Sequence, residues 1–109
     1  MEPTNDSILV FKFGGASVKS ANAINNVVDI LKRYDNRKII VVVSAMGKTT
    51  NNLESLFDAA INQNQELFTS IKETLYDFHI EIINKLFSNG KYETIKHKIA
   101  QVFDDINAF

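Results

Sequence analysis

Ile8-Leu9-Val10-Phe11-Lys12-Phe13 is the first of two apolar runs that determine the architecture of this chain, and it leads directly into Gly14-Gly15. The second run is Lys38-Ile39-Ile40-Val41-Val42-Val43-Ser44. Both are rich in β-branched and aromatic residues and apolar on both alternating faces, which is typical of buried parallel strands. We therefore expect two parallel strands in one sheet, each covered on both faces.

The segment between the two runs has the pattern of an amphipathic helix. Its apolar residues recur at three- and four-residue spacings, namely Ile24, Val27, Val28, Leu31 and Tyr34. Asp35-Asn36 then supplies a turn back to the second strand. Strand, helix and strand form a βαβ unit, whose crossover is right-handed in almost all proteins. The expected fold class is α/β.

The rest of the chain has helical spacing nearly to its end. We expect a βαβ unit over 8–50 and a helical segment over 51–109, with helices at about 51–60, 65–87 and 92–108. The last two should form an antiparallel hairpin.

Two sequence signals mark the ends of these helices. Asn51 and Glu54 are a loose match to the pair of residues that caps a helix at its N-terminus. Ser88-Asn89-Gly90 is expected to end the middle helix, because asparagine and glycine adopt the left-handed backbone found there.

Composition excludes several classes of protein. A chain of 109 residues has room for one domain at most. Its composition, 45% hydrophobic and 23% charged, is typical of globular proteins. A net charge of -1 gives no general attraction to nucleic acid or to an anionic membrane. No cysteine is present, and His79 and His97 lack metal-site spacing, so we expect no metal site.

The sequence also bears on location. No apolar run approaches the roughly 20 residues that cross a bilayer. The polar N-terminus, Met1 to Ser7, does not resemble a signal peptide. We therefore expect a cytoplasmic protein without a membrane or nucleic-acid partner. Basic residues outnumber acidic ones over 1–50 and the reverse holds beyond, so an anion is expected in the βαβ half.

Lys12, followed by Gly14-Gly15, is the strongest local signal for chemistry. It stands at the carboxyl end of a strand, where α/β proteins bind ligands. Glycines let a ligand approach the backbone closely, and the amides of a following helix favour phosphate. A lysine there can neutralise a transferring phosphoryl group. A tight strand-to-helix turn beside an exposed lysine explains the same residues, since a lone Gly-Gly has little specificity.

Ser44-Ala45-Met46-Gly47-Lys48-Thr49-Thr50-Asn51 follows the second strand, so its start should share one crevice with the first loop. It is not a P-loop, because that motif needs a glycine at position 42, which is valine. The first loop also lacks the Gly-x-Gly spacing of a dinucleotide fingerprint. Residue types alone do not separate two roles for the hydroxyl groups of Ser44, Thr49 and Thr50. They are equally typical of turns and helix caps and of ligand contacts.

Both loops resemble one enzyme family. Val10-Phe11-Lys12-Phe13-Gly14-Gly15-Ala16-Ser17-Val18 closely resembles the Lys-Phe-Gly-Gly-Thr-Ser-Val signature of aspartokinases. The segment from Val41 to Asn51 resembles their second-strand motif. The resemblance covers residues 8 to about 56, and the helical remainder is similar in architecture only. Ala16 departs from the signature, which has threonine there.

The resemblance implies an activity and a fold. Aspartokinases transfer the γ-phosphoryl group of ATP, with Mg²⁺, to the side-chain carboxylate of L-aspartate, the first step toward lysine, threonine and methionine. Their amino-acid-kinase fold is a mainly parallel sheet between helices, so this chain is expected to be the N-terminal βαβ portion of such a sheet, followed by a helical hairpin. The resemblance also implies a homo-oligomer.

The resemblance further implies roles for individual residues. Lys12 would be catalytic and contact the transferring phosphoryl group, and Phe13, Gly14, Gly15 and Ser17 would complete the ATP phosphate site. Ser44 and Thr50 would bind aspartate.

Aspartokinases are much longer than this chain, which is therefore expected to be an inactive N-terminal fragment of an active enzyme. Two alternatives stay open. One is another amino-acid kinase with a different acceptor. The other is a freestanding, non-catalytic interaction module with a vestigial Gly-Gly loop.

Overall fold

The computed structural model describes residues 7–88 and 90–107. The chain divides into two compact units, residues 1–48 and 49–109. The division falls two residues before the boundary expected from the sequence. The described elements are β1 (Ile8–Phe13), η1 (Gly15–Val18), α1 (Ala21–Lys32), β2 (Lys38–Val43), α2 (Thr49–Ile61), α3 (Gln65–Leu86) and α4 (Gly90–Asn107).

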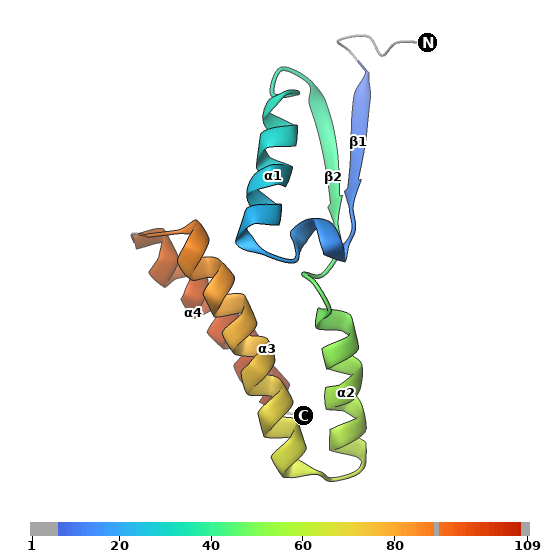
Figure 1. The fold of residues 1–109 in the computed structure, drawn as a ribbon, viewed down its shortest axis with the longest axis vertical. Helices are drawn as coiled ribbons and strands as arrows, with labels where there is room; N and C mark the ends of the chain where they lie inside the picture. Colours follow the sequence, from blue (N-terminus) through green and yellow to red (C-terminus); the bar gives the residue numbers. More distant parts are fainter. Residues whose placement is uncertain (1–6, 89, 108–109) are drawn as a thin grey trace. The chain divides into compact units, whose positions relative to one another are not determined.

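The first unit is a βαβ unit, which confirms the α/β fold class (Figure 1). Strands β1 and β2 are parallel, in a register that runs from Ile8 opposite Lys38 to Phe13 opposite Val43. Helix α1 begins after Ser20, whose Oγ accepts a hydrogen bond of 3.1 Å from the Ala23 N–H. That contact satisfies one of the N–H groups that the first turn of a helix leaves unpaired.

One face of this sheet carries the core of the first unit. Phe13, Val18 and Val27 are buried together, and partly buried apolar residues pack around them: Phe11, Ile24, Ile30, Leu31 and Met46. The centroids of the Phe11 and Tyr34 rings lie 5.1 Å apart. Val28 was expected on the covered face of α1, but it is 42% exposed, whereas Ile30 packs against this core.

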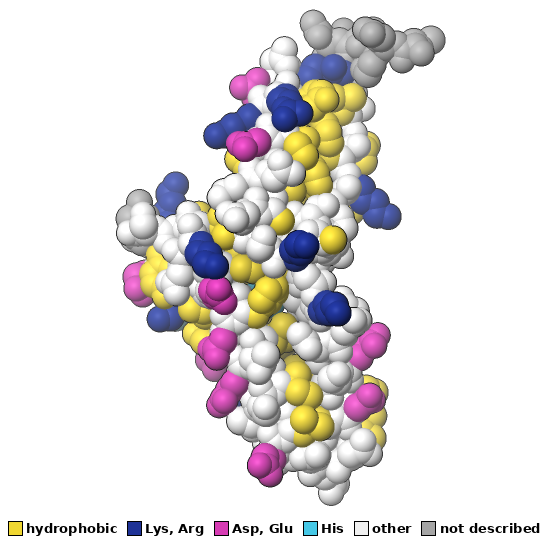
Figure 2. Space-filling model, viewed as in Figure 1, with side chains coloured by type: hydrophobic (Ala, Val, Ile, Leu, Met, Phe, Trp, Pro, Cys, Tyr) yellow, Lys and Arg dark blue, Asp and Glu magenta, His cyan; other side chains and the backbone are white. Residues whose placement is uncertain are grey.

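The opposite face of the sheet is uncovered within the first unit. Its apolar side chains are largely exposed: Ile8 at 58%, Val10 at 66%, Ile40 at 51% and Val42 at 48%. Figure 2 shows hydrophobic side chains gathered on the surface of this part of the chain. The expectation that both faces are buried is therefore wrong for this unit taken alone. Its single α-helix can cover only one side of the sheet.

The second unit consists of three helices. Leu56 of α2, Leu75 of α3 and Phe103 of α4 form its buried centre. Helices α3 and α4 lie side by side and antiparallel, as expected. Lys72 Nζ donates to Asn107 Oδ1 at 2.6 Å near one end of the pair, and the Tyr76 ring meets Phe103 edge-on further along.

Two expectations about helix ends are wrong. Helix α2 begins at Thr49, so Asn51 lies inside it rather than capping it. Helix α3 ends at Leu86 and is followed by extended backbone at Phe87, while Gly90 is the first residue of α4 and does not have a left-handed backbone. The other expected stop residue, Asn89, lies outside the described residues, as does Ala108 at the expected end of the last helix.

The turn between α2 and α3 carries a left-handed residue that the sequence did not signal. Gln63 has φ 55°, and its N–H donates to the carbonyl of Ala60. The next N–H, of Asn64, donates to Ala59 at 2.9 Å. This pair of bonds is the Schellman arrangement, in which the residue at the left-handed position is usually glycine. Asn64 then caps α3, its Oδ1 accepting from the Leu67 N–H.

Within residues 7–88 and 90–107, no helix combines the length and the apolar character needed to span a bilayer.

Candidate functional site

The two loops singled out in the sequence are joined to each other in the first unit. Each follows the carboxyl end of one of the two parallel strands. The Ser44 N–H donates to the Phe13 carbonyl at 3.0 Å, which extends the ladder past the end of β2. The Gly47 N–H then donates to the Gly15 carbonyl at 3.1 Å. The candidate site is therefore a pair of loops fixed against one another through their backbones.

The two glycines of the first loop have different surroundings. A Cβ atom on Gly15 would lie 2.8 Å from the Gly47 carbonyl oxygen and 3.2 Å from that of Ala45. At Gly14, a Cβ atom would meet no heavy atom within 4 Å. Gly15 is thus required by the close approach of the second loop, while Gly14 leaves one side of the backbone open to a ligand.

The glycines lead into a short 3₁₀ turn and not into an α-helix. Turn η1 covers Gly15–Val18, and α1 begins only at Ala21. The Ser17 N–H donates to the Gly14 carbonyl at 3.0 Å, which closes the turn. The first N–H groups of such a turn have no partner within it. Any contact with phosphate at Gly14 and Gly15 would therefore come from individual amides of this turn, because the α-helix begins only at Ala21.

Lys12 and Phe13 lie on opposite faces of the sheet. Lys12 is exposed on the uncovered face, where its register partner is Val42. The Phe13 side chain is 8% exposed and belongs to the core. Its carbonyl accepts from Ser44, so neither the side chain nor the carbonyl of Phe13 is available to a ligand. Lys12 has the accessible charged group of this loop.

The predicted hydroxyl groups are exposed. Ser17 lies in η1, and Ser44 directly follows β2. Thr50 is also exposed, but it belongs to the second unit, in the first turn of α2. The structure thus brings the loops of Ser17 and Ser44 together, and the participation of Thr50 in the same site stays a prediction.

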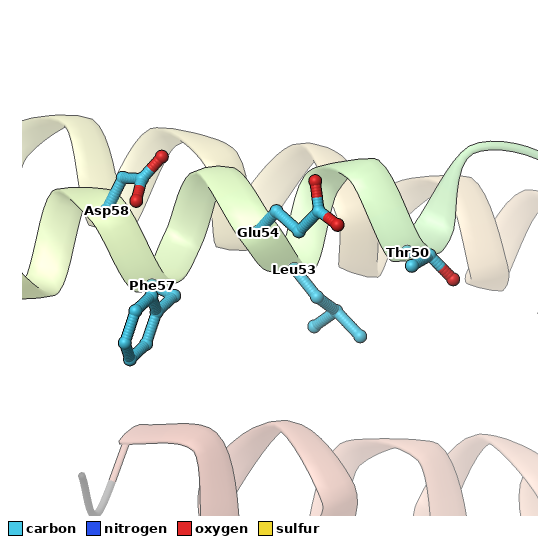
Figure 3. A pocket seen from close by; sticks show the side chains of 5 residues that line it. All are labelled: Thr50, Leu53, Glu54, Phe57 and Asp58. Carbon is cyan, nitrogen blue, oxygen red and sulfur yellow. The ribbon is translucent and has the colours of Figure 1, made fainter.

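Thr50 borders an open hollow of about 430 Å³ on α2. Figure 3 shows Leu53 and Phe57 on one side of the helix and the carboxylates of Glu54 and Asp58 on the other. The volume is within the range of small-molecule sites. Two carboxylates and no basic group line it, however, so it does not suit a phosphate or an amino-acid carboxylate.

The chemistry available at the paired loops is that of an anion site. Lys12 supplies a positive charge, the open side of Gly14 admits close approach, and Ser17 and Ser44 supply hydroxyl donors. These groups fit the phosphates of ATP. Mg²⁺ is usually held by one or two carboxylates together with the substrate's phosphates. The described ranges contain no cluster of three or more His, Asp or Glu residues that could hold a metal ion.

The histidines lie away from these loops in the chain. His79 is partly buried in α3, with its Nδ1 2.8 Å from the Leu75 carbonyl, and His97 is exposed in α4.

Sequence reasoning missed the part played by Gly47. Its φ of 59° lies in the left-handed region, and its N–H and carbonyl both face Gly15. The signal was the glycine itself, which was considered only within a rejected P-loop pattern and within the motif from Val41 to Asn51, without a role of its own.

Comparison with known proteins identifies relatives of the chain. The sequence model of the amino acid kinase family matches residues 7–105. Aspartokinase 1, chloroplastic, of Arabidopsis thaliana is 35% identical over 79 residues, covering 71% of this chain and 14% of that protein. Aspartokinase 2 of Bacillus subtilis (strain 168) is 43% identical over 58 residues, covering 51% of this chain and 14% of that protein.

A third relative matches nearly the whole chain. Bifunctional aspartokinase/homoserine dehydrogenase 1, chloroplastic, of Zea mays is 29% identical over 105 residues, covering 96% of this chain. The matched part is 11% of that protein's length. The chain therefore spans a small part of the curated relatives it matches.

Proposed function

Because the chain belongs to the amino acid kinase family, we propose that it is the N-terminal part of an aspartate kinase and supplies the phosphate-binding loop and part of the aspartate site. The complete enzyme transfers the γ-phosphoryl group of ATP to the side-chain carboxylate of L-aspartate. A carboxylate oxygen attacks the γ-phosphorus, the bond to the β,γ-bridging oxygen breaks, and ADP leaves. The product is the mixed anhydride, aspartyl phosphate.

The observation that carries this proposal is the hydrogen-bonded pairing of the two loops. It fixes a lysine, an open glycine backbone and two serine loops at the carboxyl ends of two parallel strands. Ligands bind at this edge of parallel sheets. Phosphoryl transfer depends mainly on holding donor and acceptor in line and on neutralising the charge that moves between them.

Each predicted residue has a role in this proposal. Lys12 contacts the transferring phosphoryl group, and the backbone at Phe13, Gly14 and Gly15, with Ser17, holds the ATP phosphates. Ser44 and Thr50 contact aspartate. Mg²⁺ bound together with ATP would neutralise part of the charge on its phosphates.

Two further points belong to the proposal. The complete enzyme is a homo-oligomer in the biosynthesis of lysine and threonine. A cytoplasmic location stays a prediction from the sequence, and the relatives from Arabidopsis thaliana and Zea mays carry the word chloroplastic in their names.

The test is an assay of a complete protein that carries this chain. ATP is offered with L-aspartate or with a panel of other amino acids and carboxylates, and acyl phosphate is trapped with hydroxylamine while ADP is measured. Trapped product with L-aspartate alone supports the proposal. Product with a different acceptor would mean another amino-acid kinase, and ATP turnover with none of them would contradict the proposal.

A further inference from the structure

Gly47 joins the second loop to Gly15 of the first, and its residue type alone did not indicate this role. Its N–H is engaged by the Gly15 carbonyl at 3.1 Å, so this amide is not a free donor for a phosphate. Its own carbonyl oxygen stands 2.8 Å from the point that a Cβ on Gly15 would occupy. The contact between the loops therefore uses both polar groups of Gly47 and the missing side chain of Gly15.

The backbone conformation of Gly47 makes this contact possible. At φ 59° the residue is in the left-handed region. A residue with a side chain populates this conformation about fivefold to thirtyfold less than glycine does. Asparagine tolerates this region best among the other residues. A side chain at position 47 would thus favour a different turn after β2 and move the N–H away from Gly15.

The loops that Gly47 joins have separate roles under the proposed function. The loop with Gly14 and Ser17 holds the ATP phosphates, and the loop that begins with Ser44 holds the acceptor. We infer that Gly47 is a positioning residue, which sets the spacing between the phosphate loop and the acceptor loop before either ligand binds. This inference rests on the proposed function for its consequence in catalysis, although its structural part does not.

The arrangement of the two backbone hydrogen bonds at this site supports the inference. Ser44 donates to Phe13 at the end of the ladder, and three residues later Gly47 donates to Gly15. Two backbone bonds on either side of a short turn leave it little freedom to shift against the first loop. Misplacement of reacting groups by about 1 Å can cost two orders of magnitude in rate, so a fixed turn here matters for transfer between the loops.

The first experiment measures amide hydrogen exchange in the 109-residue chain as it stands and requires no ligand. In Gly47→Ala, exchange at the amides of residue 47 and Ser17 should rise about fivefold to thirtyfold, while the amides of the β1–β2 ladder keep their wild-type rates. Gly47→Asn should stay closer to wild type than Gly47→Ala. Unchanged exchange at Ser17, or an equal rise throughout the unit, would overturn the inference and leave Gly47 an ordinary turn residue.

The second experiment uses the complete enzyme and separates this inference from the proposed function. With activity divided by the folded fraction, Gly47→Ala should lower kcat about tenfold or more, with a smaller change in KM for ATP and for aspartate, and Gly47→Asn should restore part of the loss. An unchanged normalised kcat would overturn the positioning role while leaving the kinase assignment intact. A wild-type enzyme without kinase activity would instead refute the proposed function, and the exchange result would still decide the link between the loops.

Discussion

The carbonyl oxygen of Gly47 lies 2.8 Å from where a Cβ atom on Gly15 would stand, and the Gly47 N–H donates to the Gly15 carbonyl. A Cβ carbon and a backbone oxygen do not approach this closely without one of them moving. Here neither partner is the end of a flexible side chain. The absence of a side chain at Gly15 is thus a packing requirement of the first unit.

Gly15→Ala should destabilise the first unit by about 1–3 kcal/mol, because the added methyl group forces the two loops apart. Gly14→Ala is the matched control. The Gly14 φ of -77° suits alanine, and the surroundings of Gly14 are open. The free energy of unfolding of Gly14→Ala should therefore stay the same or rise by up to about 1 kcal/mol. Urea unfolding of both variants measures the difference. Equal losses of stability at the two positions would contradict the tight contact at Gly15.

The proposed role of Lys12 is charge stabilisation during transfer. In the complete enzyme, Lys12→Ala should lower turnover by about two to three orders of magnitude, the scale typical of losing one such group. Its folding should be unaffected, since Lys12 is exposed.

Lys38→Ala is the control for this prediction. Lys38 is also exposed and lies on the same face of the sheet, opposite Ile8 at the other end of the strands. Its removal should leave turnover near the wild-type value. If Lys12→Ala retained most of its activity, the lysine would be a surface residue of the turn and nothing more.

Ala16→Thr would restore the threonine of the family signature that the sequence resembles. Ala16 is exposed in η1, so the larger side chain has room and the melting temperature should change little. Circular dichroism during heating is sufficient to measure this. A marked loss of stability would show that the first loop packs differently from the loops that carry the threonine of this signature.

The βαβ unit was predictable because its signals are local. Few other arrangements fit the pattern of this segment. It consists of two β-branched runs, one amphipathic segment between them and a glycine pair after the first strand. The link between Gly15 and Gly47 was not predictable from one sequence. It joins residues distant in the chain, and a glycine in each loop marks an unusual backbone position without indicating which residue it contacts.

The covering of the sheet was predicted less well, for a physical reason. The runs from Ile8 and Lys38 are apolar on both faces, a pattern typical of strands that are covered on both sides. Within the first unit only α1 is present to cover them. Phe13 illustrates the same limit at the site, since its place in the ligand motif did not reveal that its side chain belongs to the core.

The left-handed residue between α2 and α3 offers a test in the second unit. Gln63 has φ 55° at the position of the Schellman turn that glycine usually occupies. Gln63→Gly should therefore raise the free energy of unfolding of this unit by about 1 kcal/mol, because the strain of a side chain in this region disappears. Gln65→Gly, inside the first turn of α3, is the control and should be destabilising or neutral. A loss of stability for Gln63→Gly would contradict this turn geometry.

The uncovered face of the sheet predicts that the 109-residue chain self-associates. Val10 is 66% exposed in the middle of that face, and both strands have an edge without a partner in the two-stranded sheet. Val10→Lys should shift light scattering toward the monomer. Val28→Lys, on α1 and 42% exposed, should not. A wild-type chain that is monomeric at high concentration would contradict this prediction and show that the apolar face stays exposed to solvent.

The same chain should lack aspartate kinase activity, although it carries the phosphate loop. Its matched part is 11% to 14% of the length of the three relatives compared above. Lys12 and the glycine loop can hold phosphates, but orientation of both substrates contributes up to about 7–11 kcal/mol of barrier reduction. A chain that carries only some of the residues that hold ATP and aspartate loses most of that contribution, so ATP-dependent trapping of aspartyl phosphate should give no signal above background. Turnover by a purified monomer would mean that these 109 residues hold a complete active site and would overturn the proposal that they are part of one.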